Sequence, residues 1–229
     1  MSARARYILS AALPQSHDGS LSLSPSLSTG YCGSCWAFSA TEQIESDYIL
    51  ATGKTQVLAP QQITSCDKTS FGCNGGTTES AYRYVMSAGG LETESDYPYT
   101  SGSRGVTGSC ESNSKDFVVD ISGYQTVSSS SRGESDMASY VGATGPLSVC
   151  VDAESWSSYT SGVMKICGSS VDHCVQAVGL DTKASTPYWI VRNSWGVTWG
   201  EQGYIYLEYG QNTCAVASDA TYTTGVKAV

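Results

Sequence analysis

The chain has 229 residues, enough for one large domain or for two small halves that share a core. Hydrophobic residues make up 40% of it, which excludes a disordered chain because burial of apolar surface can offset the lost chain entropy. The formal net charge of −9 argues against nucleic acids and anionic membranes as partners, since both attract basic surfaces.

The first 29 residues differ in character from the rest. Residues 20–30 alternate Ser and Leu around Pro25, and Ser, Leu and Pro are the residues that pyrimidine-rich codons specify. We interpret residues 1–29 as an unassigned leader that derives from a gene-model error or a retained intron. A signal peptide is the alternative, because Arg4 and Arg6 precede a short apolar run, but the cleavage context is poor. No convincing signal peptide follows from this segment.

Two helices are predicted in the first half of the chain. Ser34 can cap a helix that stops at Gly53, since serine favours helix starts and glycine favours helix ends. The apolar residues of this helix are expected on one face, at Phe38, Ile44, Tyr48 and Ile49. A second helix is predicted over residues 77–88 and ends at a pair of glycines.

Beyond about residue 115 the pattern changes from helices to strands. Five runs are rich in Val, Ile, Tyr and Trp and are bounded by Gly, Pro or Asp: residues 117–124, 146–153, 171–180, 187–195 and 203–210. Helices followed by strands indicate an α+β chain with two packed halves. We place the helical half at residues 30–118 and the β-rich half at residues 119–229.

The sequence CGSCW at residues 32–36 carries the strongest chemical signal. Thiolate is the reactive form of cysteine, and the start of a helix favours an anion through its free N–H groups and its dipole. Cys35 falls where the predicted helix begins. A redox pair or a metal site is the alternative for Cys32 and Cys35, but a metal would need further ligands and the chain has two histidines.

His173 is the candidate base, because the other histidine, His17, lies in the leader. Asn193 can orient the imidazole ring, since an amide oxygen accepts from the ring N–H without adding negative charge. Trp195 would shield that hydrogen bond from water. The alternative for Asn193 is a turn asparagine at the end of a strand.

Four segments together resemble one known family: CGSCWAFSA, the CNGG of residues 73–76, VDHCVQAVG and YWIVRNSWGVTWGEQGYI. They are similar to the papain family of cysteine peptidases, and to its cathepsin-L-like branch most of all, from about Gly30 to at least Ala217. The resemblance implies an α+β, papain-like fold with a helical left half, a β-barrel-like right half and the active-site cleft between them. The C-terminal end can then cross back to the left half.

The resemblance also implies a function. It predicts a cysteine endopeptidase in which Cys35 forms a thioacyl intermediate, His173 acts as acid and base, and Asn193 orients His173. It implies peptide or protein substrates, a monomer, and neither a cofactor nor a metal. Together with the cysteine content it indicates a lysosomal, vacuolar or extracellular location.

Nine cysteines are present, and the resemblance assigns six of them to disulfides: Cys32 with Cys73, Cys66 with Cys110, and Cys167 with Cys214. Cys35, Cys150 and Cys174 remain. Cys150 and Cys174 match positions that line the family's S2 pocket and could form a fourth disulfide if their Cα atoms lie within about 7 Å. We expect them instead to remain free, as soft apolar walls of the pocket.

Further substrate-binding positions, Trp195 among them, follow from the resemblance alone. Gly75 and Gly76 resemble the backbone stretch that pairs with an extended peptide. The S2 pocket is expected to be surrounded by Thr78, Cys150, Asp172, Cys174 and Asp219. A carboxylate at Asp219 would let this pocket accept Arg as well as Leu or Phe, and the preference between them is open.

Thr29 departs from the family pattern. The family carries a glutamine six residues before the nucleophile, and its side-chain amide donates to the oxyanion of the reaction. Threonine is too short to reach that point, so the oxyanion hole would keep the backbone N–H of Cys35 and lose a donor worth about 10²–10³ in rate. The alternative to a working peptidase is therefore a catalytically impaired, peptide-binding homologue.

Overall fold

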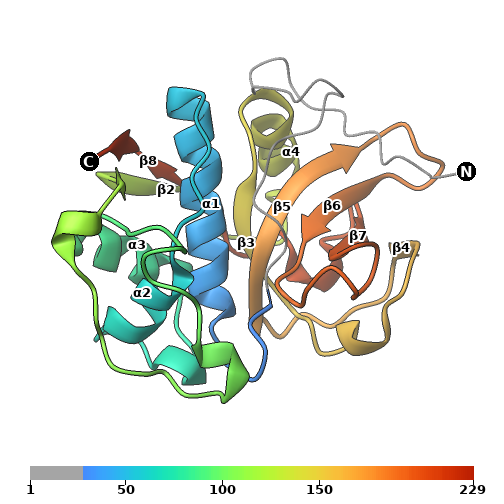
Figure 1. The fold of residues 1–229 in the computed structure, drawn as a ribbon. Helices are drawn as coiled ribbons and strands as arrows, with labels where there is room; N and C mark the ends of the chain where they lie inside the picture. Colours follow the sequence, from blue (N-terminus) through green and yellow to red (C-terminus); the bar gives the residue numbers. More distant parts are fainter. Residues whose placement is uncertain (1–27) are drawn as a thin grey trace, which may run out of the picture.

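The chain folds into a helical half and a β-rich half that meet along one long helix (Figure 1). The structure is a computed structural model and describes residues 28–229. Most of the leader, with its gene-model and signal-peptide interpretations, lies outside the described residues. The described part of the helical half contains α1 (Cys35–Thr52), α2 (Pro60–Cys66) and α3 (Thr78–Ala88).

The β-rich half is built around a seven-stranded sheet in the order β2-β8-β3-β5-β6-β7-β4. All neighbouring pairs are antiparallel except β4 and β7. The helix α4 (Glu134–Ala143) packs Met137 and Val141 into the core of this half. The strands are β2 (Gly123–Ser128), β3 (Leu147–Val151), β4 (Val163–Met164), β5 (His173–Asp181), β6 (Tyr188–Arg192), β7 (Tyr204–Glu208) and β8 (Ala220–Thr224).

The expected β-barrel-like shape of this half needs correction. Over the described residues the sheet is open, with β2 at one edge and β4 at the other. The edge strand β2 pairs only with β8, and the two-residue β4 pairs only with β7, so the edges do not join. The chain is therefore α+β with an open sheet in its second half.

The two halves have separate apolar cores. Trp36, Ile63 and Tyr82 belong to the first core, while Trp156 and Trp189 belong to the second. The C-terminal end returns to the helical half, because β9 (Lys227–Ala228) pairs with β1 (Val119–Asp120) and Val119 is part of the first core. In the described part of the chain no helix combines the length and the apolar character that crossing a membrane requires.

The long helix α1 begins and ends where the sequence predicts. Gly53 adopts a left-handed conformation with φ of 70°, and its N–H donates to the carbonyl of Ile49, which ends the helix. Ser34 is the N-cap residue of α1, as predicted, but its hydroxyl does not take part in the capping. Its side chain makes no capping hydrogen bond, because the hydroxyl lies 2.6 Å from the Tyr99 hydroxyl instead.

The four apolar residues expected on one face of α1 are buried, but burial is not confined to that face. Every residue of α1 from Trp36 to Ile49 is buried, including charged and polar side chains. The reason is the position of α1 between the helices of one half and the sheet of the other, so the helix has almost no face left for water (Figure 1). Its buried polar residues are Ser39, Thr41, Glu42, Gln43, Glu45, Ser46 and Asp47.

Residues 28–229 contain four disulfides. Three of them join the pairs that the resemblance implies: Cys32 with Cys73, Cys66 with Cys110, and Cys167 with Cys214. The fourth joins Cys150 to Cys174, so the expectation that these two remain free is wrong. They are direct partners in the β3–β5 pairing, with Cα atoms 4.0 Å apart, and this register brings both side chains to one face of the sheet.

A count of reactive thiols tests this pairing. Native protein that is unfolded without reductant and treated with iodoacetamide is expected to gain a single adduct, at Cys35, because the other eight cysteines are bonded. Intact-mass spectrometry gives the number of adducts, and reduced protein serves as the control with nine. Three adducts without reductant would show that Cys150 and Cys174 are free.

Asp47 is a buried carboxyl group on α1 that holds the sheet of the other half. It accepts hydrogen bonds from the backbone N–H and the hydroxyl of Thr223 at 2.8 and 2.7 Å, and from the amide of Gln43. Burial raises the pKa of Asp47 to about 6, although the hydrogen bonds from Thr223 and Gln43 oppose the rise.

The protein is expected to lose stability as the pH rises toward neutral. Asp47 holds its proton up to about pH 6 in the folded chain, whereas an unfolded aspartate loses it near pH 4. The stabilisation is thus complete below about pH 4 and is lost as the pH rises through about 6, on the order of 2 kcal/mol for this group. Thermal unfolding at several pH values measures it. Asp47→Asn should show a flatter dependence, and an unchanged slope in that variant would contradict the assignment.

Candidate active site

The loop before α1 places the Cys35 thiol at the mouth of a cleft. The Cys32–Cys73 disulfide and the hydrogen bond from the Gly33 N–H to the Cys73 carbonyl, at 2.9 Å, fix this loop against the neighbouring segment. A Cβ atom on Gly33 would approach that carbonyl to 2.6 Å, so a side chain is excluded there. Cys35 is the first residue of α1, is partly exposed, and is the one cysteine without a disulfide.

His173 and Asn193 come together from neighbouring strands. His173 opens β5, and Asn193 follows the last residue of β6. The His173 Nε2 atom lies 2.7 Å from Asn193 Oδ1, and both residues are buried. An amide oxygen can only accept, so Nε2 carries the proton and donates it. The N–H of Ser194 also donates to Asn193 Oδ1, at 2.8 Å, and this fixes the amide orientation.

Aromatic rings surround the histidine. The Trp195 ring centre lies 5.1 Å from that of His173, and the Trp156 ring meets the imidazole edge-on at 5.9 Å. These rings pack over the pair formed by His173 and Asn193 and limit access of water to it. The sequence predicts the shielding role of Trp195, whereas Trp156 carries no signal of its own in the sequence.

Cys35 and His173 shift each other's pKa in opposite directions. Burial alone would raise the pKa of the Cys35 thiol, but its hydrogen bond and charge interaction with His173 outweigh burial and lower it. Burial would lower the pKa of His173, but the interactions with Cys35 and the hydrogen bond to Asn193 raise it. Both shifts favour a thiolate next to an imidazolium.

Thr29 does not point its hydroxyl into the cleft. Its Oγ1 atom donates to the Ser194 carbonyl at 3.3 Å, its backbone N–H donates to the same carbonyl at 2.9 Å, and the residue is buried. The Tyr99 hydroxyl donates to the Thr29 carbonyl at 3.1 Å. Residue 29 is thus held at the base of the loop that leads to Cys35, and its side chain is occupied.

A cavity of about 400 Å³ lies beside the Cys35 thiol. Most of the predicted substrate-binding residues line it: Gly75, Gly76, Cys150, Asp172, Cys174 and Asp219. Thr78 is buried and does not line the cavity, because it is the first residue of α3, and Thr77 lines it instead. Trp195 also lies outside this lining, where it packs on His173. Five further lining residues were not predicted from the sequence as catalytic, disulfide-bonded or substrate-binding: Gly33, Trp36, Asn74, Thr77 and Val171.

The Cys150–Cys174 disulfide and the Asp219 carboxyl group belong to the same wall of the cavity. The backbone N–H of Cys150 donates to the Asp219 carbonyl at 3.0 Å, and this hydrogen bond holds the two residues next to each other. Burial and the neighbouring Glu79 side chain together raise the pKa of Asp219 to about 6. The cavity therefore combines apolar sulfur with an acid that titrates in the mildly acidic range.

Residues 28–229 contain no group of three or more His, Cys, Asp or Glu side chains that could hold a metal ion. A family model described as "Papain family cysteine protease" matches residues 13–224, which is most of the chain.

The chain belongs to the papain family of cysteine proteases.

Characterised members of the papain family include similar sequences. Cysteine proteinase 1 of Dictyostelium discoideum is 40% identical over 214 residues, which cover 86% of this chain and 60% of that protein. Cysteine proteinase 2 of Leishmania pifanoi is 40% identical over 200 residues, covering 85% of this chain and 44% of that protein. The chain thus spans 44% to 60% of the length of these relatives.

Solved structures of the papain family have the same fold. Bromelain from Ananas comosus, in complex with an inhibitor, is 34% identical with a TM-score of 0.79, over 88% of this chain and 94% of bromelain. Digestive procathepsin L 3 of the Tenebrio molitor larval midgut is 33% identical with a TM-score of 0.81, over 88% of this chain and 66% of that one. The papain-like fold expected from the four motifs is confirmed.

Proposed function

We propose that the protein is a cysteine endopeptidase that cleaves peptide bonds in peptide or protein substrates. The observation that carries this proposal is the arrangement of Cys35, His173 and Asn193: a thiol whose pKa is lowered by an imidazole, which in turn donates to a fixed amide oxygen. Nucleophilic catalysis by cysteine uses this order of nucleophile, base and orienting group. The family membership supports the same reaction class.

The reaction would proceed in two steps. The Cys35 thiolate attacks the carbonyl carbon, the C–N bond breaks, and the His173 imidazolium protonates the leaving amine. Water then attacks the thioester, with His173 as general base, and this releases the acid and restores the thiol. Cys35 and His173 supply the nucleophile and the proton, so the reaction needs neither a metal nor a cofactor.

Substrate would bind along the cavity next to Cys35. A Cβ atom at Gly76 would meet the Trp36 ring at 2.6 Å, whereas the space beside Gly75 is open within 4 Å. Glycine at both positions exposes backbone N–H and carbonyl groups, which an extended peptide can pair with. The wall formed by the Cys150–Cys174 disulfide and Asp219 would hold an apolar or a basic side chain next to the cleaved residue.

Four disulfides fit an oxidising compartment, so we propose a lysosomal, vacuolar or extracellular location. The acidic net charge argues against nucleic acid and anionic membrane as partners, and we propose a monomer.

A second candidate, an impaired homologue that binds peptides without cleaving them, is favoured by one observation. Thr29 stands where the oxyanion-binding glutamine is expected, and its hydroxyl donates to Ser194. The Cys35 backbone N–H would then be the remaining donor to the oxyanion.

Labelling with a peptidyl epoxide tests the proposed function. Purified protein at about pH 5.5, between ordinary carboxylate and imidazole pKa values, is expected to gain one adduct that intact-mass spectrometry detects. Cys35→Ser should gain none. Folded wild-type protein that remains unlabelled would support the impaired homologue. Labelled protein that hydrolyses no peptide would show a formed cleft with a defective oxyanion hole.

A further inference from the structure

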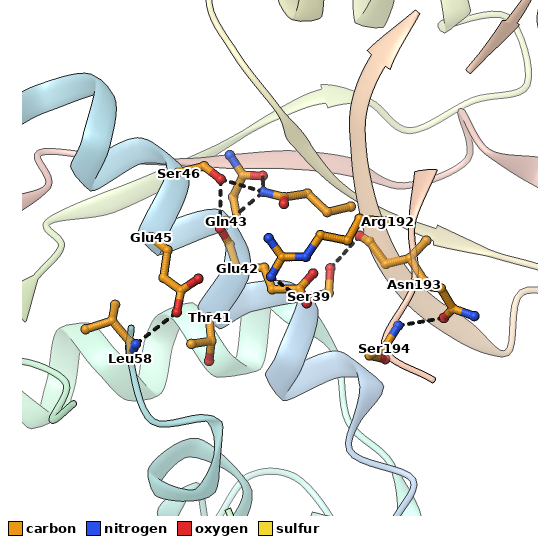
Figure 2. Close-up of polar contacts among 12 residues, drawn as sticks. Ser39, Thr41, Glu42, Gln43, Glu45, Ser46, Leu58, Arg192, Asn193 and Ser194 are labelled. Carbon is orange, nitrogen blue, oxygen red and sulfur yellow. Dashed lines mark hydrogen bonds and ion pairs between the residues drawn. The ribbon is translucent and has the colours of Figure 1, made fainter. Parts of the chain in front are cut away.

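A buried ion pair between Glu42 and Arg192 joins α1 to the sheet, and Arg192 is next to Asn193 in the chain (Figure 2). The Arg192 Nη2 atom is 2.9 Å from Glu42 Oε1, and the two residues expose 1% and 5% of their surface. Removing two charges from water costs several kcal/mol per ion, and apolar replacements of similar volume are often neutral or stabilising. Stability alone therefore does not explain why this position holds two charges.

The ion pair connects the elements that carry the nucleophile and the orienting amide. Glu42 lies two turns along α1 from Cys35, the first residue of that helix. Arg192 is the last residue of β6 and directly precedes Asn193. A rigid helix transmits a shift at Glu42 to Cys35, and the chain transmits a shift at Arg192 to Asn193.

The strand that carries His173 reaches the same turn of α1. Gln176 follows His173 by three residues on β5 and pairs directly with Arg192 on β6. Its amide donates to the Glu42 carbonyl at 3.1 Å and to the Ser46 hydroxyl at 2.9 Å. Cys35, His173 and Asn193 thus extend from three elements that converge at Glu42.

The charges around the pair have defined partners. Glu45, on the same helix, accepts the Leu58 N–H at 2.9 Å (Figure 2). Burial lowers the pKa of Arg192, but the Glu42 and Glu45 carboxylates outweigh burial and raise it, so the guanidinium stays charged. Burial raises the pKa of Glu42, and Arg192 opposes the rise. The Glu45 carboxylate adds to the rise in the pKa of Glu42, whereas His173, a further positive group, opposes it.

We propose that Glu42 and Arg192 are positioning residues, whose ion pair fixes Asn193, and through it the His173 imidazole, against the Cys35 thiol. The proposal rests on the proposed function, since it concerns the geometry of that reaction. A misplacement of about 1 Å by a change outside the reacting groups can cost as much as 100-fold in rate.

A neutral double variant, Glu42→Gln with Arg192→Met, tests the proposal. It removes both charges of the pair together, so net charge is unchanged and neither member is left charged without the other. Glu45, whose carboxylate also interacts with Arg192, keeps its hydrogen bond from the Leu58 N–H. Three quantities are measured: the melting temperature, the pH dependence of Cys35 alkylation by iodoacetamide, and kcat and KM for a fluorogenic peptide. Alkylation reports on Cys35 because the other eight cysteines are bonded.

The double variant is expected to melt within a few degrees of the wild type and yet to react more slowly. Alkylation at about pH 5.5 should fall by about tenfold and its acid limb should move to higher pH, because a misplaced imidazolium stabilises the thiolate less. We expect kcat to fall by about 10- to 100-fold with KM changed by less than about twofold. A folded double variant with the wild-type alkylation profile and kcat would overturn the proposal.

Two further variants serve as a control and as a fallback for this experiment. Asp47→Asn removes another buried carboxylate from α1, one that contacts Thr223 rather than β6, and it should leave the alkylation profile unchanged. If the double variant does not fold, Glu42→Asp keeps both charges and shortens one side chain, and a smaller shift of the same acid limb is expected. No shift in Glu42→Asp would overturn the proposal. Wild-type protein that hydrolyses no peptide would refute the proposed function. The alkylation profiles would still show whether the Glu42–Arg192 ion pair affects the Cys35 thiol.

Discussion

Replacing His173 by Ala is expected to reduce peptide hydrolysis by on the order of 10⁴-fold or more, as for removal of one member of a catalytic group that acts as a unit. Two effects combine. The proposed proton donor and base of both reaction steps is lost, and the imidazole that helps to lower the pKa of the Cys35 thiol disappears. Burial, which raises the pKa, and the backbone hydrogen bonds from Cys174 and Trp36, which lower it, both remain, so the thiol pKa in the variant should rise above that of the wild type.

The measurements for His173→Ala are hydrolysis of a fluorogenic peptide and the pH dependence of thiol alkylation. His17→Ala is the matched control, since it removes the chain's other histidine from the leader, and its activity should equal that of the wild type. Wild-type activity should follow a bell-shaped pH profile. Wild-type activity rises as the pH passes the lowered pKa of Cys35 and falls as it passes the raised pKa of His173. In His173→Ala, the increase of thiol alkylation with pH should no longer occur below neutral pH. Retained activity in His173→Ala would contradict the assigned base.

Thr29→Gln is expected to raise kcat by about 10²–10³, the usual worth of one oxyanion-hole donor. The backbone of residue 29 is already fixed by the hydrogen bond from its N–H to Ser194 and by the bond from the Tyr99 hydroxyl to its carbonyl. The hydroxyl bond from Thr29 to the Ser194 carbonyl is lost in this variant, and the longer glutamine side chain can extend toward the cleft and donate a hydrogen bond from its amide. The gain should appear in kcat rather than in KM, since the oxyanion exists only during the reaction.

Steady-state kinetics on a fluorogenic peptide, normalised to epoxide-labelled sites, measures this gain. Thr29→Glu is the matched control, because it has nearly the same length but offers an acceptor in place of a donor, and it should not raise kcat. Thr29→Gln that hydrolyses no faster than the wild type would show that residue 29 does not reach the oxyanion. The wild-type rate would then reflect the Cys35 backbone N–H or a donor elsewhere in the cleft.

The parts of the fold that the sequence predicts depend on short-range signals. The start of α1 at Cys35 and its stop at Gly53 follow from residues next to each other in the chain. The five strand-like runs contain β-branched and aromatic residues at high density, and each lies in or beside an observed strand. The helix α4 escaped prediction because its residues, ESDMASYVGA, carry few strong apolar positions at helical spacing.

The features that the sequence did not predict depend on partners far along the chain. In the sequence, the polar side chains of α1 resemble the solvent-exposed face of a helix, because their partners are distant. Gln176, the partner of Glu42, lies 134 residues away from it, and Thr223, the partner of Asp47, lies 176 residues away. The fourth disulfide depends on the β3–β5 register, because a slip of one residue would turn Cys150 away from Cys174. Neither the register nor the packing of α1 can be read from local propensity.

The disulfide in the cavity wall has a consequence for how the enzyme is assayed. Reductants are added to thiol enzymes to keep the nucleophile from oxidising, and a small thiol that reaches Cys35 also enters the cavity that Cys150 and Cys174 line. Cleavage of that bond would leave two thiols where one bridge had joined the strands. Substrate side-chain preferences measured after this bond is reduced would therefore describe a different pocket from that of the oxidised protein. The measured specificity would then depend on the reductant in the assay buffer.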